Sequence, residues 1–190
     1  GSAAAHAFSQ AASAASELSD AAVLSVIDRG VDPVTGAPFF VSPLSDHPNL
    51  EAFVGLCPLS LEEMVTMARS LARGLDAAHR RGLAHLALRP TNVFVGPPPV
   101  CWTRVSDFGA GALDRATTAE DRAALAFAAP ELYAVEPQAP LSFDLAARAD
   151  VFSAALICFY AATGDHYWKA TRRRAGAGVG SGLDALPREV

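Results

Sequence analysis

Two short segments carry polar residues of types that bind metal ions or phosphates. His85, Arg89 and Asn92 precede an apolar stretch, Val93–Val95, and Asp107 opens the sequence Asp-Phe-Gly. A carboxylate and an amide oxygen are suitable ligands for a hard cation such as Mg²⁺. The same residue types also serve in structure, Asn92 by tying down its own loop and Asp107 by capping a turn. The residue types alone leave both roles open.

The clearest predicted helix precedes the first of these segments. Ser60 and Glu63 form a capping box, and Gly82 closes the helix after two arginines. Gly74 lies inside this helix, which predicts a close approach to a neighbour. The predicted buried face has apolar residues at spacings of three and four: Leu61, Met64, Val65, Ala68, Leu71, Ala72, Leu75 and Ala78.

The segments that follow predict a hairpin and a buried helix. Residues 93–95 and 102–105 are predicted strands joined by a proline-rich turn. Residues 130–135 are predicted as a helical turn and 137–147 as a loop. An apolar stretch over 149–163 predicts a buried helix that starts at Asp150 and ends at Gly164.

The N-terminal part predicts a helix and a second hairpin. Alanine-rich residues 3–19 place apolar side chains on one face at helical spacing. Residues 23–31 and 38–42 are predicted strands, because they are rich in β-branched and aromatic residues and flank a turn at 32–36. A short helix is predicted near residues 49–54.

In order and spacing, these segments resemble the bacterial serine/threonine protein kinases. His85 to Asn92 resembles the catalytic loop of that family, Asp107-Phe108-Gly109 its D-F-G, and Ala129-Pro130-Glu131 its A-P-E. The resemblance covers nearly the whole chain. It implies an α+β, protein-kinase-like fold: a mainly α-helical C-lobe at 45–190, cut short at its end, and a truncated N-lobe at 1–44 of one helix plus a β-hairpin.

The resemblance also assigns roles to single residues. Asn92 and Asp107 stand where the family holds magnesium, and His85 stands where a histidine braces the D-F-G backbone. Arg89 replaces the lysine of the family's L-K-P sequence. The positions with implied structural roles are Phe108 and Gly109 in the D-F-G, Glu131 as an anchor of the activation segment, with its partner arginine expected beyond residue 190, and Asp150 as an anchor of the catalytic-loop backbone.

Several positions depart from the family pattern. Ala87 stands where the family has its catalytic aspartate, and loss of a general base typically lowers a rate by roughly a hundred- to ten-thousand-fold. Leu86 replaces the arginine that reads a phosphate, and Ala11 falls where helix C has its glutamate. The threonine before A-P-E is replaced within the alanine-rich residues 123–128. The glycine-rich loop and the strand-3 lysine have no counterpart in these residues, so the resemblance implies a pseudokinase.

Composition and charge limit the classes of function and the cellular compartment. The net charge of −5 gives nucleic-acid binding no electrostatic support. Cys57, Cys101 and Cys158 are odd in number and lack metal-ligand spacing, which favours buried free thiols in a reducing, cytoplasmic compartment. Neither a signal peptide nor a continuous apolar run of ~20 residues is expected, so no membrane association is predicted.

The leading functional prediction is a catalytically inactive signalling scaffold that acts by protein–protein interaction. An open apolar edge at Phe39, Phe40 and Val41 is expected to bind a protein partner or a second copy of the chain. One alternative is a serine/threonine kinase or phosphotransferase fragment. Another is a non-hydrolysing ATP/Mg²⁺ sensor using Asn92 and Asp107. No cofactor is expected beyond weak ATP/Mg²⁺ binding.

Overall fold

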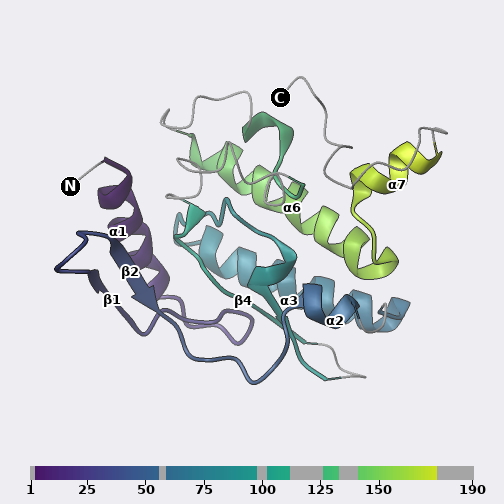
Figure 1. The fold of residues 1–190 in the computed structure, drawn as a ribbon, viewed down its shortest axis with the longest axis horizontal. Coiled ribbons are helices and arrows are strands. Elements are labelled where there is room, and N and C mark those ends of the chain that lie inside the picture. Colours follow the sequence, from purple (N-terminus) through teal and green to yellow (C-terminus); the bar gives the residue numbers. More distant parts are fainter. Residues whose placement is uncertain (1–2, 56–58, 98–101, 112–125, 133–140, 175–190) are drawn as a thin grey trace.

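The structure is a computed structural model in which a small helix–hairpin unit lies beside a larger helical part (Figure 1). Helix α1 (Ala3–Ser16) packs on the hairpin of β1 (Asp28–Val31) and β2 (Pro38–Val41). The α+β class predicted from the sequence is confirmed, whereas the lobe boundary near residue 44 stays a prediction. The residues that the structure describes are 3–55, 59–97, 102–111, 126–132 and 141–174.

The predicted strand at residues 23–31 is too long. Regular pairing with β2 begins only at Asp28, which lies opposite Val41. The preceding residues run beside the second hairpin instead: Val23 forms an isolated parallel bridge with Val105, and the Leu24 N–H donates to the Val105 carbonyl over 2.8 Å. Val23, Leu24 and Val26 are buried there, while Ile27 is exposed, so the β-rich composition did not make one continuous strand.

Stacking and hydrogen bonds fix α1 to its hairpin. The rings of Phe8 and Phe40 stack with centroids 5.6 Å apart. The Arg29 guanidinium donates to the hydroxyls of Ser13 and Ser16 over 3.1 and 3.0 Å. Helix and hairpin therefore form one unit.

Helix α3 (Leu61–His79) confirms the predicted capping box, but its buried face is rotated from the predicted one. The Ser60 hydroxyl accepts from the Glu63 N–H, and the Glu63 carboxylate accepts from the Ser60 N–H over 2.8 Å. Leu61 and Val65 are exposed, because the helix turns other residues toward α6 and β4. A Cβ at Gly74 would lie 2.9 Å from the Ala22 carbonyl oxygen, so the predicted close approach is confirmed. The residues buried on α3 are Met67, Leu71, Gly74, Leu75 and Ala78.

The second hairpin and the short helices agree with the sequence. Strands β3 (Val93–Val95) and β4 (Thr103–Val105) pair antiparallel. Helix α2 (Leu50–Val54) begins after Asn49, whose side chain accepts from the Ala52 N–H over 2.9 Å. The 3₁₀ turn η1 (Pro90–Asn92) leads into β3. A second 3₁₀ turn, η2 (Pro130–Leu132), confirms part of the predicted turn, and residues 133–135 lie outside the described structure.

Helix α6 (Phe143–Thr163) begins earlier than predicted. The Ser142 hydroxyl caps it by accepting from the Leu145 N–H over 3.3 Å, so Asp150 lies in the helix interior and not at its start. The predicted loop is therefore wrong at 143–147, while 137–140 lie outside the described structure. Gly164 ends the helix in the left-handed region, as predicted. Helix α7 (Tyr167–Arg174) was not predicted.

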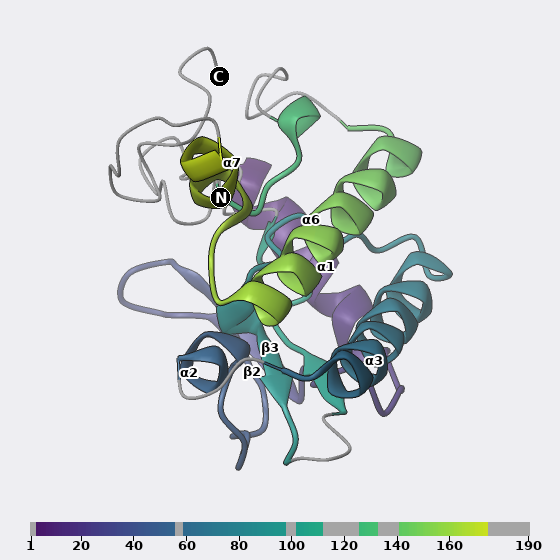
Figure 2. The same ribbon diagram turned by 90° about the vertical axis from the view of Figure 1, so that its right-hand side faces the viewer.

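By length and composition alone, α6 could cross a membrane, with a mean hydropathy of 1.5. The sequence expectation concerned a continuous apolar run, and Asp144, Arg148 and Asp150 interrupt this helix. The helix lies beside α3 in Figure 2 and carries the buried carboxylate of Asp150. These features are typical of a core helix, and one such helix is weak evidence for a membrane span.

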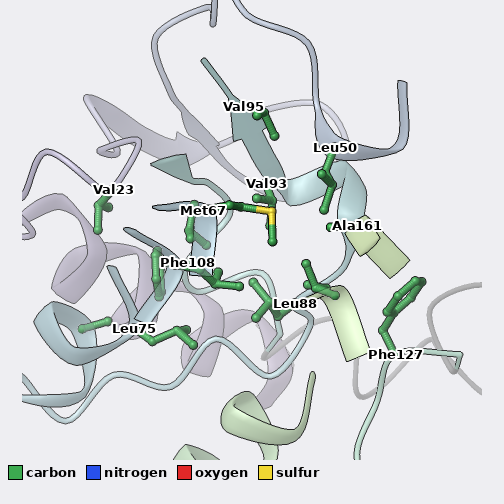
Figure 3. Close-up of a cluster of buried hydrophobic side chains, with 14 of the residues drawn as sticks. Val23, Leu50, Met67, Leu75, Leu88, Val93, Val95, Phe108, Phe127 and Ala161 are labelled. Carbon is green, nitrogen blue, oxygen red and sulfur yellow. The ribbon is translucent and has the colours of Figure 1, made fainter. Parts of the chain in front are cut away.

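The hydrophobic core joins β3, β4, α2, α3 and α6 (Figure 3). Met67 and Val93 are fully buried at its centre, and Phe108 and Phe127 extend it toward the loops. Cys158 is a half-buried free thiol, and burial raises its pKa. Cys57 and Cys101 lie outside the described residues.

Candidate functional site

Asp150 holds the loop that begins at His85. Its carboxylate accepts from the backbone N–H groups of His85 and Leu86, each over 2.7 Å. The same carboxylate lies 2.8 Å from Nε2 of His79 at the end of α3. Asp150 is 1% exposed, so these charge-assisted hydrogen bonds form away from water and fix the loop strongly. This is the anchoring role that the family resemblance implied.

Leu86 adopts a backbone conformation that a bulky residue rarely takes. Its φ is 62°, in the left-handed region. The conformation costs about 1 kcal/mol or more, and it persists only where the surroundings enforce it. The hydrogen bond from the Leu86 N–H to Asp150 provides that enforcement.

His85 braces the segment that precedes Asp107. Its side chain is fully buried, Nε2 lies 2.8 Å from the Ser106 carbonyl oxygen, and its ring lies 4.8 Å from that of Phe108. Because a carbonyl only accepts, we assign the proton to Nε2. Nδ1 then accepts from the Ala87 N–H over 3.4 Å. Both ring nitrogens are engaged, so His85 acts as a brace and not as a base.

Asn92 ties the loop to the D-F-G segment. Its side-chain Nδ2 donates to the Ala87 carbonyl over 3.1 Å, and its Oδ1 accepts from the Thr91 hydroxyl over 3.2 Å. Its own carbonyl accepts from the Ser106 N–H over 2.9 Å. Asn92 is 3% exposed. The structural role that the residue type left open is therefore directly visible.

Asp107 also has a positive φ, 62°, and its carbonyl accepts from the Ala110 N–H over 3.0 Å. The turn is thus capped by the backbone, and the half-buried carboxylate makes no hydrogen bond within the described residues. Within those same residues no group of three His, Cys, Asp or Glu side chains is placed to hold a metal. Asn92 and Asp107 therefore remain the candidate ligand pair. They could hold Mg²⁺ only together with water or phosphate oxygens.

Gly109 places α1 directly against the D-F-G turn. A Cβ at Gly109 would lie 3.0 Å from the Ala11 carbonyl carbon and 3.1 Å from the Ala12 nitrogen. Ala11, which the resemblance places at the helix-C glutamate position, is therefore adjacent to the D-F-G and carries only a methyl group.

The position expected to hold a general base has only a methyl group. Ala87 is half-buried, and its N–H and carbonyl are both used to hold the loop. Arg89 lies at the start of η1, where its carbonyl accepts from the Asn92 N–H. Glu131 lies half-buried in η2, and the expected arginine partner of its carboxylate stays a prediction. Of the alanine-rich segment before it, residues 123–125 lie outside the described structure.

Three contributors were not found from the sequence. His79 supports Asp150 from 71 positions away, and Ser106 offers the carbonyl that His85 binds. Trp168 donates from Nε1 to the Ala126 carbonyl over 3.1 Å. No local pattern marks these residues, because each contact joins distant parts of the chain.

Comparison with known proteins supports the resemblance to protein kinases. A family model described as "Protein kinase domain" matches residues 39–178. The serine/threonine-protein kinase Pkn1 of Myxococcus xanthus is 30% identical over 146 residues, which are 75% of this chain and 20% of that protein. The DNA damage-responsive serine/threonine-protein kinase RqkA of Deinococcus radiodurans is 29% identical over 149 residues, 77% of this chain and 22% of that protein. The chain thus spans about a fifth of the length of these relatives.

Solved structures agree on the fold. The Mycobacterium tuberculosis PknI kinase domain superposes with a TM-score of 0.65 at 24% identity, covering 85% of this chain and 58% of that one. Rad53 residues 1–466, in complex with AMP-PNP, superposes with a TM-score of 0.66 at 17% identity, covering 84% of this chain and 38% of that one. The chain belongs to the protein kinase family and is similar to its bacterial serine/threonine, Hanks-type members.

Proposed function

We propose that this chain is a catalytically inactive kinase-like module, a pseudokinase, that acts in cytoplasmic signalling by binding another protein. The observation that carries the proposal is Ala87 at the position of the general base, inside a loop whose hydrogen-bonded frame is complete. A methyl group can neither accept a proton nor orient a hydroxyl. The relatives are named as kinases, and under this proposal the chain does not share that activity.

The contrast between frame and chemistry supports the proposal. Asp150, His85 and Asn92 all make the contacts that shape the loop. These hydrogen bonds fix the shape of the loop, and none of them provides a general base. Leu86 adds to the loss, because its apolar side chain cannot form an ion pair with a phosphate.

A radiolabelled phosphate-transfer assay on the longest natural form of the protein tests this proposal. We expect transfer no higher than that of an Asp107→Asn variant, which removes the acidic candidate ligand and reports any contaminating kinase. Transfer by the unaltered protein that disappears in Asp107→Asn would overturn the proposal and favour the serine/threonine kinase alternative.

For the partner-binding surface we propose the outer edge of β2. Within the described residues β2 pairs only with β1, and its side chains at Phe39 and Val41 are 44% and 40% exposed. Phe40 points the other way, onto Phe8. The strand carries no charge, and uncharged apolar edges add strands from other chains. The added strand comes from a partner protein or from a second copy.

Light scattering at high concentration, together with amide exchange at 39–41, tests the edge. We expect association that Phe39→Lys weakens, because an edge lysine opposes strand addition. Val34→Lys is the matched control, since Val34 is 90% exposed at the hairpin turn, outside the ladder. A protein that stays monomeric, binds no partner and exchanges rapidly along 39–41 would contradict the proposed edge.

The second candidate is a sensor that binds ATP and Mg²⁺ without hydrolysis. It is favoured by Asp107, whose carboxylate makes no hydrogen bond within the described residues and whose neighbour Ser106 donates its N–H to the Asn92 carbonyl. Ligand at a hundred times its dissociation constant should stabilise the fold by about 2.7 kcal/mol. A thermal-shift titration with ATP and Mg²⁺ tests this candidate. If it gives no shift, the sensor is contradicted and the scaffold proposal remains.

A further inference from the structure

We infer that Ser13 on α1 is a phosphorylation site whose phosphate is bound by the guanidinium of Arg29 on β1. The side chain of Arg29 reaches from the hairpin to the helix, where it donates to the hydroxyls of Ser13 and Ser16 over 3.1 and 3.0 Å. The inference goes beyond the proposed function, because it concerns a modification of α1 and holds whether the chain is a scaffold or a kinase.

The guanidinium of Arg29 has neutral partners. Within the part of the chain that the structure describes, it makes these two hydrogen bonds and no ion pair. The Asp28 carboxylate accepts from the Arg29 backbone N–H instead, and the Glu17 carboxylate lies 3.8 Å from the guanidinium of Arg81. The planar fork of a guanidinium matches phosphate oxygens, and hydrogen bonds between charged groups are roughly twice as strong as neutral ones. The site therefore fits a phosphate group better than the two hydroxyls that it holds.

The two serines of this site differ in how free their hydroxyls are. They lie on one face of α1, since residues three apart in a helix are neighbours. The Ser16 hydroxyl already donates to the Ser13 carbonyl over 2.7 Å, and Ser16 ends the helix beside Glu17, where the helix dipole and the carboxylate disfavour a phosphate. The Ser13 hydroxyl accepts from Arg29 and donates to no group within the described residues. Ser13 is therefore the better phosphate acceptor.

The modification is a phosphoryl transfer catalysed by another protein, an active serine/threonine kinase that binds ATP and Mg²⁺. Oγ of Ser13 forms a bond to the γ-phosphorus of ATP, the bond from that phosphorus to the bridging oxygen of the β-phosphate breaks, and ADP leaves. The hydroxyl proton passes to the base of that kinase. The product carries a charge of about −1.5 to −2 at neutral pH next to the guanidinium of Arg29.

A phosphate on Ser13 would tighten the contact between α1 and its hairpin, which lie side by side in Figure 1. The helix already stacks Phe8 on Phe40 of β2 and lies against Gly109 of the D-F-G turn. A charged pair between Ser13 and Arg29 adds a contact with β1. Because Arg29 is exposed to water, the gain is modest, and we expect amide exchange in α1 to slow about two- to fivefold.

Amide exchange on the full-length protein with genetically encoded phosphoserine tests the role of Arg29. Ser13→phosphoserine should slow exchange in α1, and the additional change Arg29→Gln should abolish the slowing. Ser9→phosphoserine is the matched control, because Ser9 is exposed on the same helix and its side chain makes no hydrogen bond within the described residues. This control should not slow exchange in α1.

Two results of this experiment would overturn the inference. One is exchange in α1 that is no slower with phosphoserine at position 13, and the other is a slowing that persists in Arg29→Gln. If Arg29→Gln alone unfolds α1, salt decides instead. The slowing should become smaller in 1 M salt, where the screening length falls to about 3 Å, and a slowing that salt leaves unchanged would contradict the ion pair.

Phosphopeptide mass spectrometry tests whether the modification occurs. The sample is the protein isolated from its own cells, before and after incubation with a lysate of those cells, ATP and Mg²⁺. We expect phosphate on Ser13 in at least one of these samples. Ser13 without phosphate in both would overturn the inference.

Discussion

The carboxylate of Asp150 lies 2.7 Å from the backbone nitrogen of Leu86, and Leu86 has a φ of 62°. A buried acid on α6 thus holds an apolar residue of the loop in a conformation that it would otherwise avoid. Asp150 and Leu86 are 64 positions apart in the sequence. This pair fixes the shape of the loop that contains Ala87, the position at which the resemblance places the base.

Asp150→Ala should destabilise the protein strongly. The change removes a buried acceptor from the His85 and Leu86 amides and leaves His79 without its partner. We expect the free energy of unfolding to fall by about 2–4 kcal/mol in urea titrations. Asp144→Ala on the same helix is the control: that side chain is 76% exposed, so its loss should cost less than about 1 kcal/mol.

Leu86→Ile should lower the free energy of unfolding more than expected for a change that conserves side-chain volume. A β-branched side chain is poorly tolerated at positive φ, so we expect a loss of about 1–2 kcal/mol in unfolding free energy. Leu86→Met, which is unbranched at Cβ, should lose less. Equal stability of the two variants in denaturant would show that Leu86 does not carry backbone strain.

Gly109→Ala should displace α1. The new Cβ would approach the Ala11 and Ala12 backbone to about 3 Å, at a φ of 97°. Gly36→Ala separates the two causes, because Gly36 also has a positive φ, 70°, but has no atom within 4 Å of its Cβ position. We expect about 1 kcal/mol lost for Gly36→Ala and at least about twice that for Gly109→Ala. Faster amide exchange in α1 should accompany only the Gly109 change.

Acid should weaken the link between the α1–β1 connection and α3. The Ala22 N–H, and then Arg73, hold the pKa of Asp20 below its ordinary value of 3.8. Because the folded pKa is the lower one, the stabilisation is complete above the unfolded pKa and is lost as pH falls through the folded pKa. The stability difference between wild type and Asp20→Asn should therefore shrink from about pH 5 to about pH 3. A difference that is the same at both pH values would contradict this assignment.

Local signals in the sequence predicted the elements well where the physical cause is local. The Ser60–Glu63 capping box and the helix end at Gly164 involve only neighbouring residues, and both are present as predicted. The start of α6 was predicted at Asp150, but Ser142 caps the helix and Asp150 lies within it as a buried residue. The buried face of α3 was predicted only in part, because its contacts with β4 and α6 determine which residues are buried.

The sequence by itself determined the family and the order of the elements, because each depends on residue type and spacing along the chain. Only the tertiary structure decided how the loop that contains Ala87 is held. The contacts of Asp150 with His79 and Leu86, and of His85 with Ser106, join positions 21 to 71 residues apart. No periodicity or motif encodes such pairs, because they form only when α3, α6 and the hairpin pack together and exclude water from the polar groups between them.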